Sequence, residues 1–254
     1  MRRMRMLALA CLLLSCVDAS AMVGGAGPAP DAIGRSVVLI VGSRGNSCTG
    51  VALAPDLVLT AAHCVLPGAD YKIVEFDAAR QPLLRDVASV TAHPRFDLKT
   101  MLAHRATADV ALLKLAAPLA SVEPAALVAP GLTVVPGDAF TVAGNGVAVR
   151  GDGRSGGTVR AAALVATGKP GTLQIRLFDP VTKGETAGLG ACTGDSGAPV
   201  FRLAPKPVVV GVVSWSTGPG NSGGCGGLTG VTPLTLYLEW ITGTAKILRN
   251  QLRS

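Results

Sequence analysis

The sequence has no uninterrupted run of 18 apolar residues, the length that a membrane-spanning helix requires. It also has no internal repeat, no long low-complexity tract and no cluster of residues with metal-ligand spacing. We therefore expect no stable membrane span, no bound metal and no other cofactor. What the 254 residues do have is a hydrophobic content of 49%, enough to bury a substantial core in one folded protein.

The chain begins with the features of an export signal. Arginines precede a short apolar run, and Ala19-Ser20-Ala21 has the small-x-small pattern of a signal-peptidase site. We therefore predict that residues 1–21 are removed and that the protein is secreted or periplasmic. As an alternative, Leu13 to Cys16 resembles a bacterial lipoprotein cleavage box, which would leave the protein lipid-anchored through Cys16.

The charge balance argues against a nucleic-acid partner. The whole chain carries a formal charge of +7, and removal of residues 1–21, with three arginines and one aspartate, lowers it to +5. The basic residues are spread over many segments. The excess therefore indicates a solvated surface.

Cysteine usage is consistent with export. Two of the six cysteines lie within residues 1–21, so the exported part keeps Cys48, Cys64, Cys192 and Cys225. An even number in an exported chain predicts two disulfides, and spacing alone leaves three connectivities open.

Glycine and proline separate short apolar runs rich in Val, Leu and Ile, which are typical of strands. The segment from Pro233 to Arg253 instead repeats apolar residues at helical spacing, although Gly243 weakens the pattern. Glycine-rich residues 144–157 predict an exposed loop, and residues 116–136 a connector between two halves. The class is therefore all-β with a terminal helix. The predicted strands are Ser36 to Gly42, Val51 to Leu53, Leu57 to Thr60, Val110 to Leu115, Thr141 to Ala143, Leu173 to Phe178 and Val208 to Trp215.

Three polar residues lie in informative settings. His63 follows an apolar strand in Thr60-Ala61-Ala62-His63-Cys64, Asp109 opens an apolar run, and Ser196 is flanked by glycines in a tight turn. A serine hydroxyl is a poor nucleophile unless an imidazole takes its proton, and the imidazole needs a carboxylate that fixes its tautomer. Ser196, His63 and Asp109 are thus predicted as nucleophile, general base and orienting acid. The N–H groups of Gly194 and Ser196 would bind the oxyanion.

The motifs TAAHC, DVALLKL and GDSGAP, in this order, resemble those of the chymotrypsin/trypsin-like serine proteases, peptidase family S1. Subtilisin-like and α/β-hydrolase triads run in other orders. The resemblance implies a serine endopeptidase with two packed six-stranded antiparallel Greek-key barrels. The first barrel would span residues 34–120, the second 130–232, and a terminal helix 233–252. Peptide or protein substrates, protein inhibitors and a monomeric state are implied too.

The resemblance also implies pairings. Cys48 would bond to Cys64, and Cys192 to Cys225. Cleavage after residue 21 would free the α-amino group of Met22, which in this family pairs with the aspartate before the nucleophile, here Asp195. Because no pro-segment lies between residues 21 and 22, we expect signal removal itself to activate the enzyme.

The same alignment predicts the substrate cleft. Gly190 stands where trypsin-like members place an aspartate, so specificity for Arg or Lys is not expected. Ser214 and Trp215 resemble the strand that lines the cleft, and Ser216, where most relatives have glycine, narrows the entrance. A neutral residue before the cleaved bond is expected, small to medium apolar first and aromatic next.

The sequence leaves two alternatives to the peptidase. A non-catalytic or weakly active binding protein could keep the same fold, although the complete set of triad residues argues against it. A chaperone-protease that shares the barrels is disfavoured by the paired cysteines and by the lack of a trailing peptide-binding domain. His93 and His104 are not accompanied by motifs of this kind, and we predict that they are structural or solvent-exposed.

Overall fold

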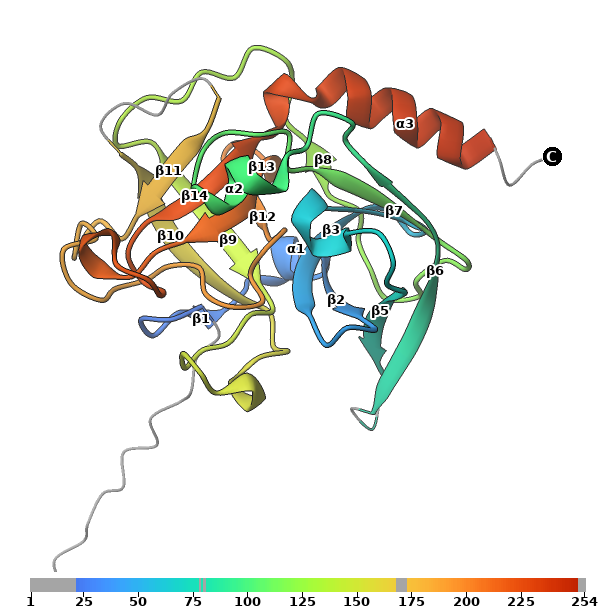
Figure 1. Ribbon diagram of the computed structural model, residues 1–254, viewed down its shortest axis with the longest axis horizontal. Coiled ribbons are helices and arrows are strands. Elements are labelled where there is room, and N and C mark those ends of the chain that lie inside the picture. The colour runs from blue at the N-terminus through green and yellow to red at the C-terminus, as the bar shows by residue number, and fades with distance from the viewer. Residues whose placement is uncertain (1–21, 78, 80, 168–172, 251–254) are drawn as a thin grey trace, which may run out of the picture.

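The computed structural model describes residues 22–77, 79, 81–167 and 173–250, and the predicted export signal with Cys16 lies outside them. Two β-barrels lie side by side, the first coloured blue to teal in Figure 1 and the second yellow to red. The six strands of the first barrel are hydrogen-bonded in the closed order β2-β3-β4-β7-β6-β5. They are β2 (Val37–Gly42), β3 (Ser47–Ala54), β4 (Leu57–Thr60), β5 (Tyr71–Phe76), β6 (Pro82–Ala92) and β7 (Ala111–Leu115).

Strands β4 and β7 are fully buried, which is why both read as continuous apolar runs. Lys114 is the exception in β7, and its ammonium group pairs with the carboxylate of Asp56. Side chains such as Ile40, Val58 and Ile73 fill the core of this barrel. Of these two buried strands, β4 ends just before His63 and β7 begins just after Asp109.

The second barrel is built from later strands in the closed order β9-β10-β11-β14-β13-β12. Strand β1 (Gly27–Pro28) adds to β10, and β8 (Ala126–Leu127) pairs in parallel with β13. All pairings within the barrels are antiparallel, so the predicted all-β fold is confirmed. The strands are β9 (Ala139–Gly144), β10 (Arg160–Ala166), β11 (Ile175–Phe178), β12 (Pro199–Arg202), β13 (Val208–Ser216) and β14 (Thr229–Pro233).

The C-terminal helix α3 (Leu238–Asn250) lies on the outside of the barrels (Figure 1). Its residues Ile241 and Ala245 line a common pocket with Leu53 and Leu57 of the first barrel. The helix starts later than predicted because residues 234–236 form a separate 3₁₀ turn, η4 (Leu234–Leu236), and it continues through Gly243. No helix in the described part of the chain is long and apolar enough to cross a membrane.

Two short helices were not predicted, since one turn is too short to show a period. They are α1 (Asp31–Gly34) and α2 (Leu98–Leu102), and the 3₁₀ turns are η1 (Ala62–Val65), η2 (Gly153–Ser155) and η3 (Pro219–Asn221).

The glycine-rich segment 144–157 differs from the prediction of an exposed loop. Its first residues, Gly144 to Gly146, are buried. A Cβ atom on Gly144 would overlap the carboxylate of Asp195, and one on Gly146 would lie 2.5 Å from its Cγ. These glycines therefore allow the backbone to approach a buried acid, and only the later part of the segment is an exposed loop.

Candidate active site

His63 is held by the turn η1 that follows β4. The neighbouring Cys64 is bonded to Cys48 of β3, which ties this turn to the barrel. The Nδ1 atom of His63 lies 2.8 Å from Oδ2 of Asp109, and the backbone N–H of His63 donates to Oδ1 over 2.9 Å. Because both carboxylate oxygens face His63, the position of the imidazole is determined by Asp109.

Asp109 is completely buried just before β7. Its Oδ2 also accepts a hydrogen bond from the hydroxyl of Ser214, on β13 of the second barrel, over 2.5 Å. A carboxylate at Nδ1 makes that nitrogen the donor and leaves Nε2 as a proton acceptor.

The turn that carries Ser196 packs against the segment that leads to His63. Gly197 has φ +78°, and a Cβ there would overlap Thr60 Oγ1 and lie 2.9 Å from the backbone nitrogen of Ala61. The backbone N–H of Thr49, on β3, donates to the carbonyl of Ser196 over 2.8 Å. The first barrel thus supports the serine turn through close backbone contacts.

Strand β13 connects the serine turn to the acid. The N–H of Gly197 donates to the carbonyl of Val213 over 2.7 Å, and the next residue, Ser214, bonds Asp109. Among the described residues no hydrogen bond joins the Ser196 hydroxyl to His63, whose Nε2 lies 3.9 Å from Cys64 Sγ. The structure therefore holds His63 and Asp109 in direct contact and Ser196 through its backbone. Hydrogen bonds to a nucleophile are often long before substrate binds.

The N–H groups of Gly194 and Ser196 have no acceptor among the described residues. Gly194 has φ +92°, and its Cβ position would lie 2.9 Å from the Cα of Gly146. The carbonyl of Gly194 is held separately, by the hydroxyl of Thr49 over 2.8 Å. Both N–H groups are thus available to bind an anionic oxygen.

Asp195, which lies between Gly194 and Ser196 in the sequence, is fully buried. Its carboxylate accepts hydrogen bonds from the N–H groups of Gly146 and Cys192, each over 2.9 Å. Burial raises the pKa of Asp195 to about 7, although the two N–H groups act to lower it. No cation of the described residues forms an ion pair with this carboxylate.

The segment that begins at Met22 lies close to the serine turn. Met22 is completely buried, and Val23 forms an antiparallel bridge with Gly190. Gly24 packs directly on the backbone of Gly188 and Leu189. The first described residues therefore follow the chain that leads into Cys192 and Asp195.

Trp215 lies beside the site on β13, and its indole ring is covered by neighbouring groups. The imidazole of His104 stacks on the indole at 4.5 Å between centroids and 11° between planes. The backbone of Gly230 packs tightly against the ring, and the guanidinium of Arg176 lies 5.8 Å from its centroid. His104 is solvent-exposed, as its sequence setting suggested, but its stacking on Trp215 could not be foreseen.

The remaining predicted cleft residues, Gly190 and Ser216, both lie against the segment 224–226. Gly190 is buried, and a Cβ there would lie 3.1 Å from the Cα of Gly226. Ser216 donates to the carbonyl of Gly224 over 3.4 Å, and the Cys192–Cys225 disulfide ties this segment to the chain that follows Gly190. Position 190 therefore contributes no charge to this region.

Other titratable residues near the site have structural roles. His93 is buried against Tyr237 and Trp240, and burial lowers the pKa of its imidazole. Cys48, His63 and Cys64 lie close enough to suggest a metal site. The two sulfurs are bonded to each other, however, so they cannot act as thiolate ligands.

Comparison with known proteins agrees on one family. The family model described as Trypsin matches residues 22–241. A vitellin-degrading protease of Bombyx mori is 31% identical over 77% of this chain and 75% of its own length. Human serine protease 56 is 32% identical over 87% of this chain, but this chain spans only 38% of that protein.

Solved structures show the same architecture. Human heparin binding protein superposes with a TM-score of 0.68 over 87% of this chain and 95% of its own, at 22% identity. At that identity the likeness concerns the fold alone.

Proposed function

Because the chain belongs to the trypsin family of serine proteases, we propose that it is a secreted serine endopeptidase that hydrolyses peptide bonds. The observation that carries this proposal is the contact of His63 with Asp109, beside the turn of Ser196. Ser214 donates a further hydrogen bond to the same carboxylate. These groups come from both barrels, so they meet only in the folded protein.

In the first half of the reaction, the Ser196 hydroxyl attacks the carbonyl carbon of the scissile peptide. His63 Nε2 takes the hydroxyl proton as the Oγ–C bond forms, and Asp109 stabilises the resulting imidazolium. The carbonyl oxygen becomes anionic and accepts hydrogen bonds from the free N–H groups of Gly194 and Ser196. Loss of one such donor typically reduces the rate by about 10²–10³-fold.

In the second half, the imidazolium gives its proton to the leaving amine, the C–N bond breaks, and an acyl-enzyme remains on Ser196. Water then attacks this ester with His63 again acting as base. Hydrolysis releases the acid product and returns the proton to Ser196. In this scheme Ser196 and His63 would carry the proton transfers between substrate, water and enzyme.

We propose further that removal of residues 1–21 activates the enzyme. A free α-amino group on buried Met22 would supply the cation that the buried carboxylate of Asp195 lacks among the described residues. Ordering of Asp195 would in turn order Gly194 and Ser196, its neighbours in the chain. Supporting this, Val23 already bridges to Gly190 on the approach to that turn.

For specificity, we propose a neutral residue before the cleaved bond, small to medium apolar in preference to aromatic. Gly190 provides no carboxylate to attract Arg or Lys. The side chain of Ser216, which is bonded to the carbonyl of Gly224, would narrow the entrance. A positional scanning library with varied residues before the cleaved bond measures this preference directly.

Covalent labelling with a fluorophosphonate distinguishes the peptidase from a non-catalytic binding protein of the same fold. We expect the protein that begins at Met22 to be labelled on Ser196, located by mass spectrometry of the modified peptide. Labelling should be lost in Ser196→Ala and retained in Ser89→Ala, which changes an exposed serine on β6. An unlabelled wild-type protein that is correctly folded would instead support the binding protein.

A further inference from the structure

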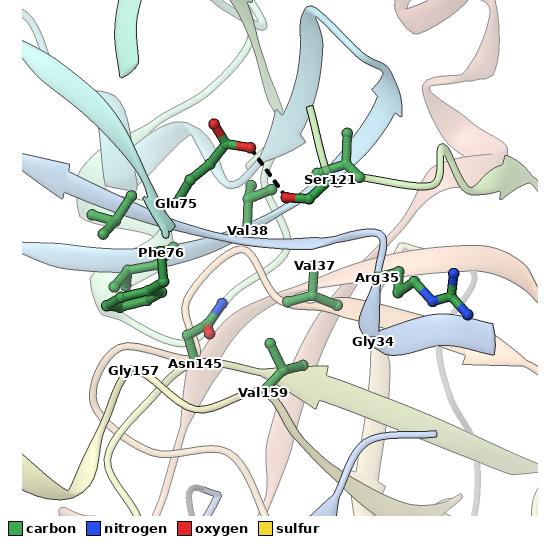
Figure 2. Close-up of a pocket in the computed structure, with 13 residues that line it drawn as sticks. Gly34, Arg35, Val37, Val38, Glu75, Phe76, Ser121, Asn145, Gly157 and Val159 are labelled. Carbon is green, nitrogen blue, oxygen red and sulfur yellow. Dashed lines mark hydrogen bonds between the residues drawn. The ribbon is translucent and has the colours of Figure 1, made fainter. Parts of the chain in front are cut away.

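A cavity of about 270 Å³ lies between the two barrels, away from the residues assigned to catalysis. Figure 2 shows its walls: Val37 and Val38 from β2, Phe76 at the end of β5, and Asn145 and Val159 from the second barrel. The volume is more than ten times the minimum that a single water needs and is near the lower end of small-molecule sites. The cavity is therefore large enough for one aromatic ring.

Asn145 provides an unused polar group in this cavity. The residue is 5% exposed, and its Nδ2 is buried without a hydrogen-bond partner among the described residues. In Figure 2 the amide extends toward β2 between Phe76 and Val159. A buried donor without an acceptor is unfavourable, so a molecule that supplies an acceptor here gains affinity.

The charged groups that line the cavity already have partners. Glu75 pairs with Arg85 and accepts hydrogen bonds from Ser121 and the backbone of Ala120. Arg35 pairs with Glu123 over 2.5 Å. A charged ligand would have to break these pairs, whereas a neutral ligand would not.

We propose that this cavity binds a small, flat, uncharged aromatic molecule whose carbonyl oxygen accepts a hydrogen bond from Asn145 Nδ2. The ring packs against Val37, Val159 and the ring of Phe76. Binding does not depend on the proposed peptidase activity, because no residue assigned to catalysis lines the cavity.

The backbone around Asn145 connects the cavity to the serine turn. The N–H of Asn145 donates to Thr49 Oγ1, which itself donates to the carbonyl of Gly194. The next residue, Gly146, donates its N–H to Asp195. A ligand on Asn145 therefore contacts a residue that is one or two hydrogen bonds from Gly194 and Asp195.

The test uses acetophenone as probe and the Ser196→Ala protein, so that self-cleavage cannot interfere. Two-dimensional ¹H–¹⁵N NMR follows the side-chain amide of Asn145 during titration. We expect a saturable shift of this amide and of the backbone of Gly146 and Gly157, with a Kd on the order of 1 mM for a ligand of this size. The proposal would be overturned if the Asn145 amide showed no saturable shift at any acetophenone concentration up to the solubility limit.

Two variants locate the site. Val159→Phe fills the cavity and should abolish binding, while Val181→Phe, the same change at an exposed position, should leave it intact. Asn145→Leu keeps the shape but removes the donor, and should weaken binding at least about tenfold. If Val159→Phe fails to fold, the affinity of Asn145→Leu alone tests whether the molecule binds at this cavity. Undiminished affinity in Asn145→Leu, or shifts confined to Trp215 and its neighbours, would contradict the proposal.

Discussion

Ser214 and His63 both contact one oxygen of Asp109, from opposite barrels, at 2.5 Å and 2.8 Å. The acid therefore does more than orient an imidazole, because it also links the two halves of the molecule. Burial of a carboxylate is costly unless hydrogen-bond donors replace the water that it loses, and these two groups are such donors.

Replacement of Ser214 by alanine should impair both activity and folding. Removal of one donor from a buried carboxylate costs about 1–3 kcal/mol. We expect a loss of about tenfold in kcat/KM and a lower urea midpoint, while Ser89→Ala changes neither. Unchanged kcat/KM with unchanged stability would show that the Ser214 bond is dispensable.

His104 should control access to the face of Trp215. We predict that His104→Asn, which removes the ring but tolerates the observed positive φ of 54°, raises kcat/KM several-fold for peptides long enough to reach Trp215. Hydrolysis of a single-residue ester should be unaffected, because it does not reach that ring. Leu102→Ala, an exposed change two residues away that keeps the imidazole, serves as the control and should behave like the wild type. An equal effect on ester and peptide would mean that His104 acts on the triad instead.

Asp195 should make the stability of the uncleaved chain dependent on pH. Its folded pKa of about 7 exceeds the ordinary value of 3.8, so protonation of Asp195 favours the folded state. This contribution to the free energy of unfolding is fully present below about pH 3.8 and is lost as the pH rises through about 7. In a Ser196→Ala background, the urea midpoint of chains retaining residue 21 should fall between pH 5 and pH 8. Asp195→Asn should reduce that fall, since an amide does not titrate.

The matching experiment uses the chain that begins at Met22. A free α-amino group beside Asp195 would stabilise the carboxylate, so the midpoint should fall less over the same pH range. Identical pH dependence in the cleaved and uncleaved chains would argue against the proposed Met22–Asp195 pair.

Gly197 should be intolerant of any side chain. Gly197→Ala would place a Cβ into Thr60 Oγ1 and 2.9 Å from the nitrogen of Ala61, besides requiring a positive φ. Gly137→Ala has the same backbone strain, at φ +84°, but meets nothing within 4 Å. We therefore expect Gly137→Ala to cost about 1 kcal/mol and Gly197→Ala clearly more, with activity lost only in the latter. Equal unfolding midpoints would show that the turn can move away from Thr60.

Much of the architecture can be predicted from local sequence. Apolar runs between glycines and prolines are enough for the all-β class, and the His, Asp and Ser motifs are enough for the family. The burial of Gly144 to Gly146 cannot be read in this way, because glycine-rich sequence is typical both of exposed loops and of close backbone packing. Here the packing partner, Asp195, lies about fifty residues further along the chain.

The same limit applies to side chains that meet across the barrels. Ser214 could be placed on a cleft strand, but its bond to Asp109 spans 105 residues and depends on how the barrels pack. The stacking of His104 on Trp215 depends on a loop conformation with positive φ, which a histidine does not signal. The unused amide of Asn145 is visible only when its whole environment is known.

In the proposed mechanism, Ser196 forms an acyl-enzyme and His63 acts as its base. Pre-steady-state hydrolysis of a p-nitrophenyl ester by the protein that begins at Met22 measures this step directly. We expect a burst of about one equivalent of p-nitrophenol per protein molecule, and no burst in Ser196→Ala or in His63→Ala. A folded wild-type protein that gives no burst and no turnover, or a burst that persists in Ser196→Ala, would contradict it.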